Sequence, residues 1–362
     1  MSIPAVLVNQ DPHRNGALSL DGAKQLQGIN LENRERSGLD FPDRAHDPLG
    51  KEVRSLKAVP SSKDIGEKLK EVVATLLPGL RGMYGRTEEE LDDNLAVPII
   101  KGEEMARNLI REIGCDYETA KDLTVLTLYD VAILIGDTDS MVLEENGARK
   151  RALIQYVDGI TEICSMAKES GILAMHFMNR GRGKENWTGK SQEYLDQHSY
   201  GGVTRIGTAL KKKILDRYAL GNPDQRKPLL VLIVTDRAIE GERRGHLKSI
   251  IRDCVNERAG VGKGFEAITF QFSRVGNDYG AAQLLRALGQ DPDLAEFINV
   301  LPDKFDLELQ PADKWIVLPK ILLGAILPKW HQAAHRNLAK IKGSLADKGK
   351  NVAGADPEDW WE

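Results

Sequence analysis

The chain has 362 residues, of which 41% are hydrophobic and 29% charged, and its formal net charge is −4. Such a chain can bury a large core, and because its acidic and basic residues are intermixed it offers no basic field to hold a nucleic-acid backbone. Its three cysteines lie far apart and form no CxxC pair, which indicates reduced thiols in a cytoplasmic protein.

Residues 1–60 are polar, and their apolar residues follow neither a period of 2 nor one of 3.6. We expect a flexible or extended arm here, which could also serve in interactions. The first residues lack the basic segment and apolar run of a secretory signal.

A small helical region is predicted for residues 61–121. The segment SSKDIGEKLKEVVATLL places its apolar residues on one stripe, with Ser62 as the cap and Pro78-Gly79 as the stop. Two further helices are predicted at Glu103–Ile113 and Tyr117–Leu126. Because short amphipathic helices are marginal alone, we expect all three to pack on the domain that follows.

In residues 122–330, apolar strands alternate with amphipathic helices. The predicted strands are Val131–Ile135, Ile172–Met178, Leu229–Val234, Ala267–Phe272 and Phe297–Val300, and the predicted helices are Gly147–Glu169, Ile206–Tyr218, Gly245–Glu257 and Ala281–Leu288. Near-continuously apolar strands in this order predict an α/β fold with a doubly wound, mostly parallel sheet and helices on both faces.

The end of the chain combines a helix with an acidic tail. The helix is predicted from Trp315 to about Ile341, and its longest apolar stretch is too short to cross a bilayer. Residues 331–362 comprise the helix end and a tail that closes with Trp360 and Trp361. Buried tryptophans contribute strongly to interfaces, so we expect these two to bind a partner.

Three segments of the main domain resemble the signature segments of a von Willebrand factor A domain. They are YDVAILIGDTDSM at 129–141, GGVTRIGTAL at 201–210 and VLIVTDRAIEGE at 231–242. A later segment, FQFSRVGNDYGAAQLLRALG at 270–289, resembles intracellular members of that family, particularly fungal ones. The resemblance extends from roughly residue 122 to residue 329, and it implies a Rossmann-like sheet in a protein-recognition module.

In that family a D-x-S-x-S sequence, a distant threonine and a T-D-G aspartate form a metal-ion-dependent adhesion site that usually holds magnesium. Hydroxyls and waters around the ion leave one position for a partner's carboxylate. Aligned on its Ser-Met ending, the first segment supplies Thr138 and Ser140 but has Gly136 in place of the leading aspartate. Thr204 and Asp236 match the other two ligands. The resemblance therefore implies a degenerate site, with or without a bound Mg²⁺.

Two acidic residues and an arginine complete the predicted site. Asp137 could supply the missing carboxylate ligand if the loop bends, and Asp139 is assigned to partner binding. Arg237 stands where the family has glycine. Its guanidinium could replace the cation by pairing with Asp236 or with a partner's acid, or it could face solvent.

We therefore predict a non-enzymatic module that binds an acidic residue of a partner protein at the crevice between these loops. One alternative is a structural protein that assembles into homo-oligomers through the arm at residues 1–60 or the terminal tryptophans. Another is a Rossmann-like enzyme, although no glycine-rich phosphate turn follows the first strand and AGVGKG at 259–264 precedes a strand. Cys164 and Cys254, on predicted helices, are interpreted as packing residues.

Overall fold

The structure is a computed structural model that describes residues 58–301 and 314–330. Almost all of the predicted arm at residues 1–60 therefore lies outside the described residues, as do Trp360, Trp361 and the rest of residues 331–362. Their role in self-assembly or partner binding stays a prediction. In the described ranges, no helix combines the length and apolar character needed to cross a membrane.

A six-stranded sheet forms the centre of the fold, with the strand order β3-β2-β1-β4-β5-β6. The strands are β1 (Asp130–Ile135), β2 (Ile172–Phe177), β3 (Lys184–Trp187), β4 (Leu229–Thr235), β5 (Ile268–Arg274) and β6 (Ile298–Val300). Every neighbouring pair is parallel except β2 and β3, which are antiparallel. The predicted α/β class with a mostly parallel sheet is confirmed.

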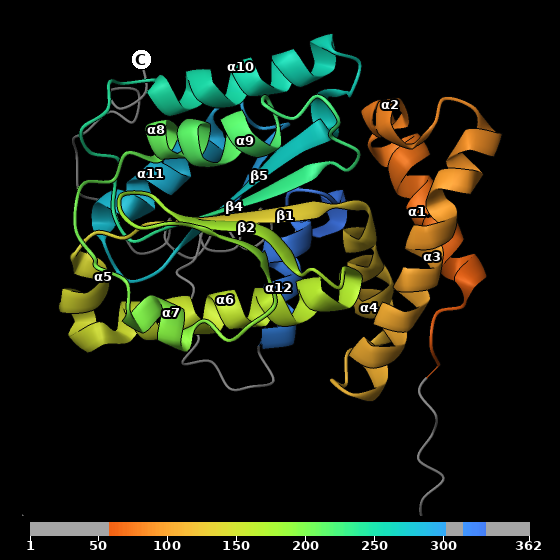
Figure 1. The fold of residues 1–362 in the computed structure, drawn as a ribbon, viewed down its shortest axis with the longest axis horizontal. Helices are drawn as coiled ribbons and strands as arrows, with labels where there is room; N and C mark the ends of the chain where they lie inside the picture. Colours follow the sequence, from red (N-terminus) through yellow and green to blue (C-terminus); the bar gives the residue numbers. More distant parts are fainter. Residues whose placement is uncertain (1–57, 302–313, 331–362) are drawn as a thin grey trace, which may run out of the picture. The chain divides into compact units, whose positions relative to one another are not determined.

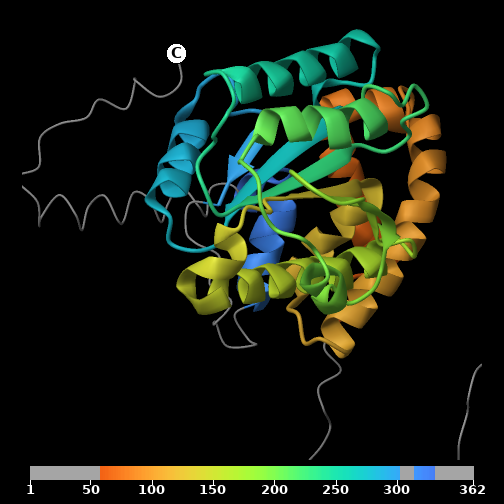
Figure 2. The same cartoon turned by 60° about the vertical axis from the view of Figure 1, so that its left-hand side comes forward.

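Helices cover both faces of this sheet, which explains why its central strands are apolar on both sides. Figure 1 shows α6 (Ala148–Ala167), α7 (Gln192–Asp196) and α12 (Lys314–Leu323) on one face, and α8 (Ile206–Leu210), α9 (Asp216–Tyr218), α10 (His246–Gly260) and α11 (Tyr279–Gln290) on the other. The turned view shows the same division (Figure 2). All seven residues of β4 are buried between these layers.

The helical region before the sheet lies beside the amino ends of the strands. It contains α1 (Ser62–Glu71), α2 (Arg81–Tyr84), α3 (Glu88–Arg111) and α4 (Tyr117–Leu123), joined by shorter helical turns at Val72–Leu76, Pro78–Leu80 and Thr124–Leu128. Its apolar residues belong to the same buried cluster as residues of β1 and α6. In Figure 1 this region stands on the right, opposite α5 (Ser140–Leu143).

Close contacts bind this helical region to the main domain. The buried carboxylate of Asp122 contacts Nζ of Lys68 at 3.5 Å, Nζ of Lys329 at 2.5 Å and Nε1 of Trp330 at 2.9 Å. These partners come from α1 and from the segment after α12, so Asp122 joins three distant parts of the chain.

Several predicted elements differ from the structure, among them the helix predicted from Trp315, which ends at Leu323 as α12. The helix predicted at Glu103–Ile113 starts at Glu88, because Thr87 and Glu90 form a reciprocal capping box and the helix continues through an internal proline. Ser61, not Ser62, caps the first helix, through the same kind of box with Asp64. The edge strand β3 was not predicted because its sequence, KENW, is polar and exposed, as suits the edge of a sheet.

Candidate functional site

The candidate site lies at the carboxyl ends of β1 and β4, the neighbouring central strands. Backbone pairing continues just past the strands, since Gly136 N donates to Val234 O at 2.7 Å and Val275 N donates to Thr235 O at 3.1 Å. The loops after β1, β4 and β5 are therefore fixed side by side. In open α/β sheets, ligand sites form at this edge.

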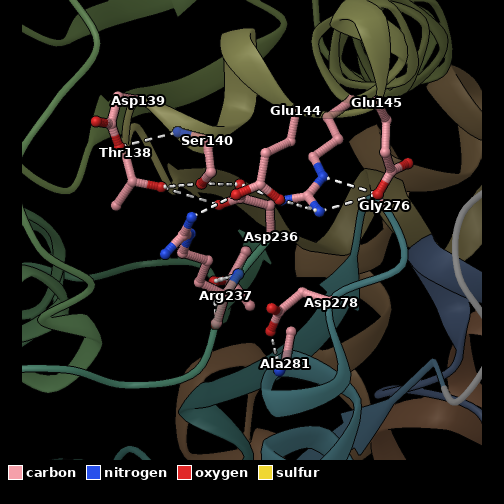
Figure 3. A network of polar contacts seen from close by, with 12 residues as sticks. Thr138, Asp139, Ser140, Glu144, Glu145, Asp236, Arg237, Gly276, Asp278 and Ala281 are labelled. Atoms are coloured by element: carbon pink, nitrogen blue, oxygen red, sulfur yellow. Dashed lines mark hydrogen bonds and ion pairs between the residues drawn. The ribbon is translucent and has the colours of Figure 1, made fainter.

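Thr138, Ser140 and Asp236 come together as the sequence predicts. Thr138 Oγ1 lies 2.8 Å from Ser140 Oγ and donates to Asp236 Oδ1 at 3.2 Å, and Ser140 Oγ donates to Asp236 Oδ2 at 2.5 Å. All three side chains are at most 4% exposed. Figure 3 shows them pointing toward one another, from the loop after β1 and the end of β4.

The cluster also contains Arg149, on the first turn of α6, which the sequence analysis missed. This side chain is 3% exposed, and its Nη1 lies 3.1 Å from Asp236 Oδ2. Its Nη2 lies 2.7 Å from Glu144 Oε2, and its Nε donates to Glu145 Oε1 at 3.0 Å. Burial acts to lower the pKa of Arg149, but the hydrogen bonds to Glu145 and Asp236 outweigh it and raise the pKa. The guanidinium is therefore permanently charged.

One sequence signal could have pointed to Arg149. It lies in the basic run ARKR at the amino end of a helix, where the helix dipole disfavours cations. A cation in that position calls for nearby carboxylates, and Glu144 and Glu145 directly precede the helix.

The loop after β5 also contacts Arg149 and its partner Glu145. Gly276 adopts a positive φ of 76°, and a Cβ there would lie 2.8 Å from Cδ and 2.9 Å from Cγ of Arg149. Only glycine leaves this space for the arginine side chain. The next residue, Asn277, donates its backbone N–H to Glu145 Oε1 at 2.8 Å.

The charged residues predicted beside the cluster have other partners. Arg237 Nη2 lies 2.5 Å from Glu144 Oε1, so the guanidinium that pairs with Asp236 is that of Arg149. Figure 3 shows the side chains of Arg237 and Glu144 meeting at the rim of the cluster. Asp139 is exposed, and its Oδ1 accepts a hydrogen bond from Ser140 N at 3.0 Å, which caps the short helix α5.

Asp137 is fully buried and serves a different part of the fold. Its carboxylate accepts hydrogen bonds from the backbone N and Nδ2 of Asn179, at 2.8 and 2.9 Å, and from Arg180 N at 3.1 Å. His198 Nε2 lies 2.9 Å from its Oδ2, and the imidazole stacks on Phe177 with ring centroids 3.4 Å apart. Asp137 thus ties the loop after β1 to the loop after β2.

Thr204 is 1% exposed, and its Oγ1 has no hydrogen-bond partner among the described residues. Its backbone carbonyl accepts from Glu240 N at 3.0 Å, which holds its loop against the loop after β4. A buried hydroxyl without a partner costs free energy, so Thr204 is a locally unfavourable feature of this part of the fold.

These donors do not fit a magnesium ion as they are arranged. Mg²⁺ demands about six oxygens in octahedral geometry. Among the described residues, Asp236 is the only carboxylate in contact with the two hydroxyls, and its Oδ2 already receives hydrogen bonds from Ser140 Oγ and from the Arg149 guanidinium. Gly136 contributes no side chain, and Asp137 is engaged elsewhere. In the described ranges, no three acidic, histidine or cysteine side chains are grouped so as to hold a metal.

Exposed arginines line the loops that surround Thr204. We name as the arginine rim Arg180, Arg182, Arg205, Arg243 and Arg244. The loops that carry them pack together: a Cβ on Gly202 would lie 2.6 Å from Asn179 Cγ, and one on Gly241 would lie 3.0 Å from Arg205 Nε. None of the five side chains forms an ion pair with a described carboxylate. The rim is thus a concentration of unpaired positive charge on a chain whose net charge is −4.

The two helical cysteines are packing residues in the structure. Cys164 and Cys254 are buried, and burial raises the pKa of each thiol to about 12. Both thiols therefore stay protonated near neutral pH, and neither is a ready nucleophile.

Comparisons with known proteins give only partial likenesses. No family model matches the chain. No curated protein matches it either. Among solved structures, it is similar to proximal thread matrix protein 1 from the mussel byssus, with 14% identity and a TM-score of 0.38 over 53% of this chain and 46% of that one. It is also similar to the ArnB paralog VWA2 from Sulfolobus acidocaldarius, with 10% identity and a TM-score of 0.31 over 54% of this chain and 44% of that one. The chain thus spans less than half the length of either protein.

Proposed function

We propose that the chain is a non-enzymatic recognition module that binds an acidic segment of a partner protein across the arginine rim. The observation that carries this proposal is the rim itself: five exposed arginines, without an ion-pair partner among the described residues, on loops that pack together beside Thr204. Guanidinium groups bind carboxylates through two parallel hydrogen bonds and are weakly hydrated, which suits them to an interface.

The surroundings of the rim favour a short acidic segment over a nucleic acid. The exposed side chain of Glu240 lies on the loop that carries Arg243 and Arg244, Asp139 is exposed on the loop after β1, and Glu144 is 41% exposed beside Arg237. A long phosphate backbone would meet these carboxylates, whereas a few carboxylates of a peptide can contact the arginines and avoid them.

Two exposed apolar side chains extend this surface. Leu143 is 74% exposed at the end of α5, and the next residue, Glu144, pairs with Arg237. Tyr279 is 68% exposed at the start of α11, and a Cβ on the adjacent Gly280 would lie 3.1 Å from Cβ of Ala238. Both thus flank the Arg237 segment, and aromatic side chains are common anchors of protein interfaces.

The proposal is tested by reversing charge on the rim. The probe is a fluorescein-labelled, glutamate-rich peptide followed by fluorescence anisotropy, and the test variant is Arg205→Glu with Arg243→Glu. The matched control is Arg226→Glu with Arg286→Glu, two exposed arginines outside the rim loops. The test variant should bind the peptide at least about tenfold more weakly, since each charge-assisted contact is strong. The control should change the affinity by no more than about twofold.

Three results would refute the proposal: no binding by the wild-type chain, an equal loss in both variants, or tighter binding of single-stranded RNA of the same length than of the peptide. The last result would assign the rim to nucleic acid. A cytoplasmic location, indicated by the cysteines, remains a prediction. Self-assembly through the ends of the chain is also a prediction, and light scattering on truncated chains can test it.

A further inference from the structure

We infer that the crevice is built to work without a metal ion, because the guanidinium of Arg149 supplies from within the protein the positive charge that a bound cation would bring. This inference concerns the cluster of Thr138, Ser140, Arg149 and Asp236 and does not depend on which partner the arginine rim binds. It holds or fails whether or not the acidic peptide binds.

Arg149 satisfies three carboxylates at once. Its three nitrogens contact Asp236, Glu144 and Glu145 at 3.1, 2.7 and 3.0 Å. With the side chain 3% exposed, these acids replace nearly all of its hydration. A divalent ion at Asp236 would repel this fixed charge at close range, or displace it and leave a buried guanidinium without its partner.

Two glycines fit the same arrangement. Gly136 removes the leading carboxylate, and the space there is narrow, since a Cβ would lie 3.2 Å from Val234 O. Gly276 leaves the space through which the Arg149 side chain passes. One glycine thus removes a metal ligand, and the other admits the replacement cation.

The hydroxyls of Thr138 and Ser140 complete the shell of Asp236. Both donate their hydrogens to its carboxylate, so together with the Arg149 guanidinium they satisfy Asp236 from within the protein. Thr204 Oγ1 alone remains without a described partner. With Asp236 neutralised in this way, the cluster has no carboxylate left over to anchor an octahedral shell of oxygens.

The test compares thermal unfolding in EDTA with unfolding in millimolar MgCl₂ or MnCl₂. The wild-type midpoint should be the same in all three solutions. In EDTA, Arg149→Met should lower the midpoint by roughly 10 °C, because it leaves three carboxylates facing one another. Manganese should then restore part of the loss, since the three carboxylates no longer face a fixed cation and attract a divalent ion instead.

Two variants sharpen the comparison. Arg151→Met removes an arginine of the same helix whose Nη1 donates to Asn146 O at 3.0 Å at the surface, so it should change neither the midpoint nor its response to manganese. Arg149→Lys keeps the positive charge but lacks the branched guanidinium group. Its unfolding midpoint should lie between those of the wild type and Arg149→Met, and manganese should not change it. If Arg149→Met does not fold, the lysine variant carries the test.

The inference is overturned if the wild-type midpoint rises with magnesium or manganese and Asp236→Asn abolishes that rise. It is also overturned if neither Arg149 variant lowers the midpoint in EDTA, because the guanidinium would then not be what balances the cluster. A rise in the midpoint of Arg149→Lys with manganese would also overturn the inference. Each measurement uses the full chain and needs no partner.

Discussion

The Nη1 atom of Arg149 lies 3.1 Å from Oδ2 of Asp236, and both side chains are almost inaccessible to solvent. The pair joins the first turn of α6 to the end of β4, so it connects one helix layer to the centre of the sheet. A buried charge pair gives little net stability relative to an apolar pair, but removal of one member leaves the other uncompensated. The cluster is therefore both the predicted site and a structural support, and experiments on it must separate the two roles.

Asp236→Asn should lower the free energy of unfolding by about 3 kcal/mol, because it leaves the Arg149 guanidinium with one fewer buried counter-charge. Urea unfolding followed by circular dichroism measures this loss. The control is Asp139→Asn, which changes an exposed carboxylate next to Ser140 in the sequence. It should cost less than about 1 kcal/mol, because asparagine also caps a helix. Equal losses in the two variants would contradict the structural role of Asp236.

Gly276→Ala should be more destabilising than a glycine substitution at a similar φ elsewhere. Gly276 has φ 76° and would place a Cβ against Arg149, whereas Gly245 has φ 70° with no atom within 4 Å of the added Cβ. Gly245→Ala should therefore cost only the conformational penalty, about 1–2 kcal/mol, and Gly276→Ala about 3 kcal/mol or more in urea unfolding. If the two costs agree, the space at Gly276 is not needed for the arginine.

The strands of the central sheet were predictable because β1, β2, β4, β5 and β6 are short apolar runs, and residues buried on both faces must be apolar. The predicted strand bounds differ from the observed ones by at most two residues. The edge strand β3 was not predictable, because an exposed edge requires no apolar pattern.

The residues of the candidate site that belong to a sequence motif were predictable. The motif predicted that the hydroxyls of Thr138 and Ser140 lie near Asp236, and both contact it, whereas Asp137 contacts Asn179 instead. Arg149 was missed because its contact with Asp236 spans 87 positions in the sequence and follows from the packing of α6 on the sheet. Local sequence patterns do not report such tertiary pairs.

Asp122→Asn should loosen the helical region before the sheet. The carboxylate is 1% exposed and holds Lys68 and Lys329 with Trp330, so its loss should cost about 3 kcal/mol in urea unfolding. Limited proteolysis should also cut the α1 region sooner. The control is Asp92→Asn, whose carboxylate is 53% exposed in an ion pair with Lys70 and should matter little. An unchanged rate of proteolysis in Asp122→Asn would show that the contacts of Asp122 do not hold the helical region in place.

His176, on β2, should make stability depend on pH in the mildly acidic range. The side chain is 6% exposed, and Nε2 lies 3.3 Å from Oη of Tyr218. Burial, together with the positive charges of Arg217 and Lys213, lowers the pKa of His176 below 6.5, while Glu185 acts weakly in the other direction. The folded state therefore binds this proton less readily than the unfolded chain does.

Because the pKa of His176 is lower in the folded state, its contribution to stability is fully present above the unfolded value of 6.5 and is lost as the pH falls from there to the folded pKa. Between about pH 7.5 and pH 5.5, the free energy of unfolding in urea should therefore fall more for the wild type than for His176→Asn. All carboxylates are the same in the two proteins, so the difference reports on His176. The titration of the imidazole by NMR should have its midpoint below 6.5. A midpoint at or above that value, or equal pH dependence in the two proteins, would show that His176 is not held neutral by its surroundings.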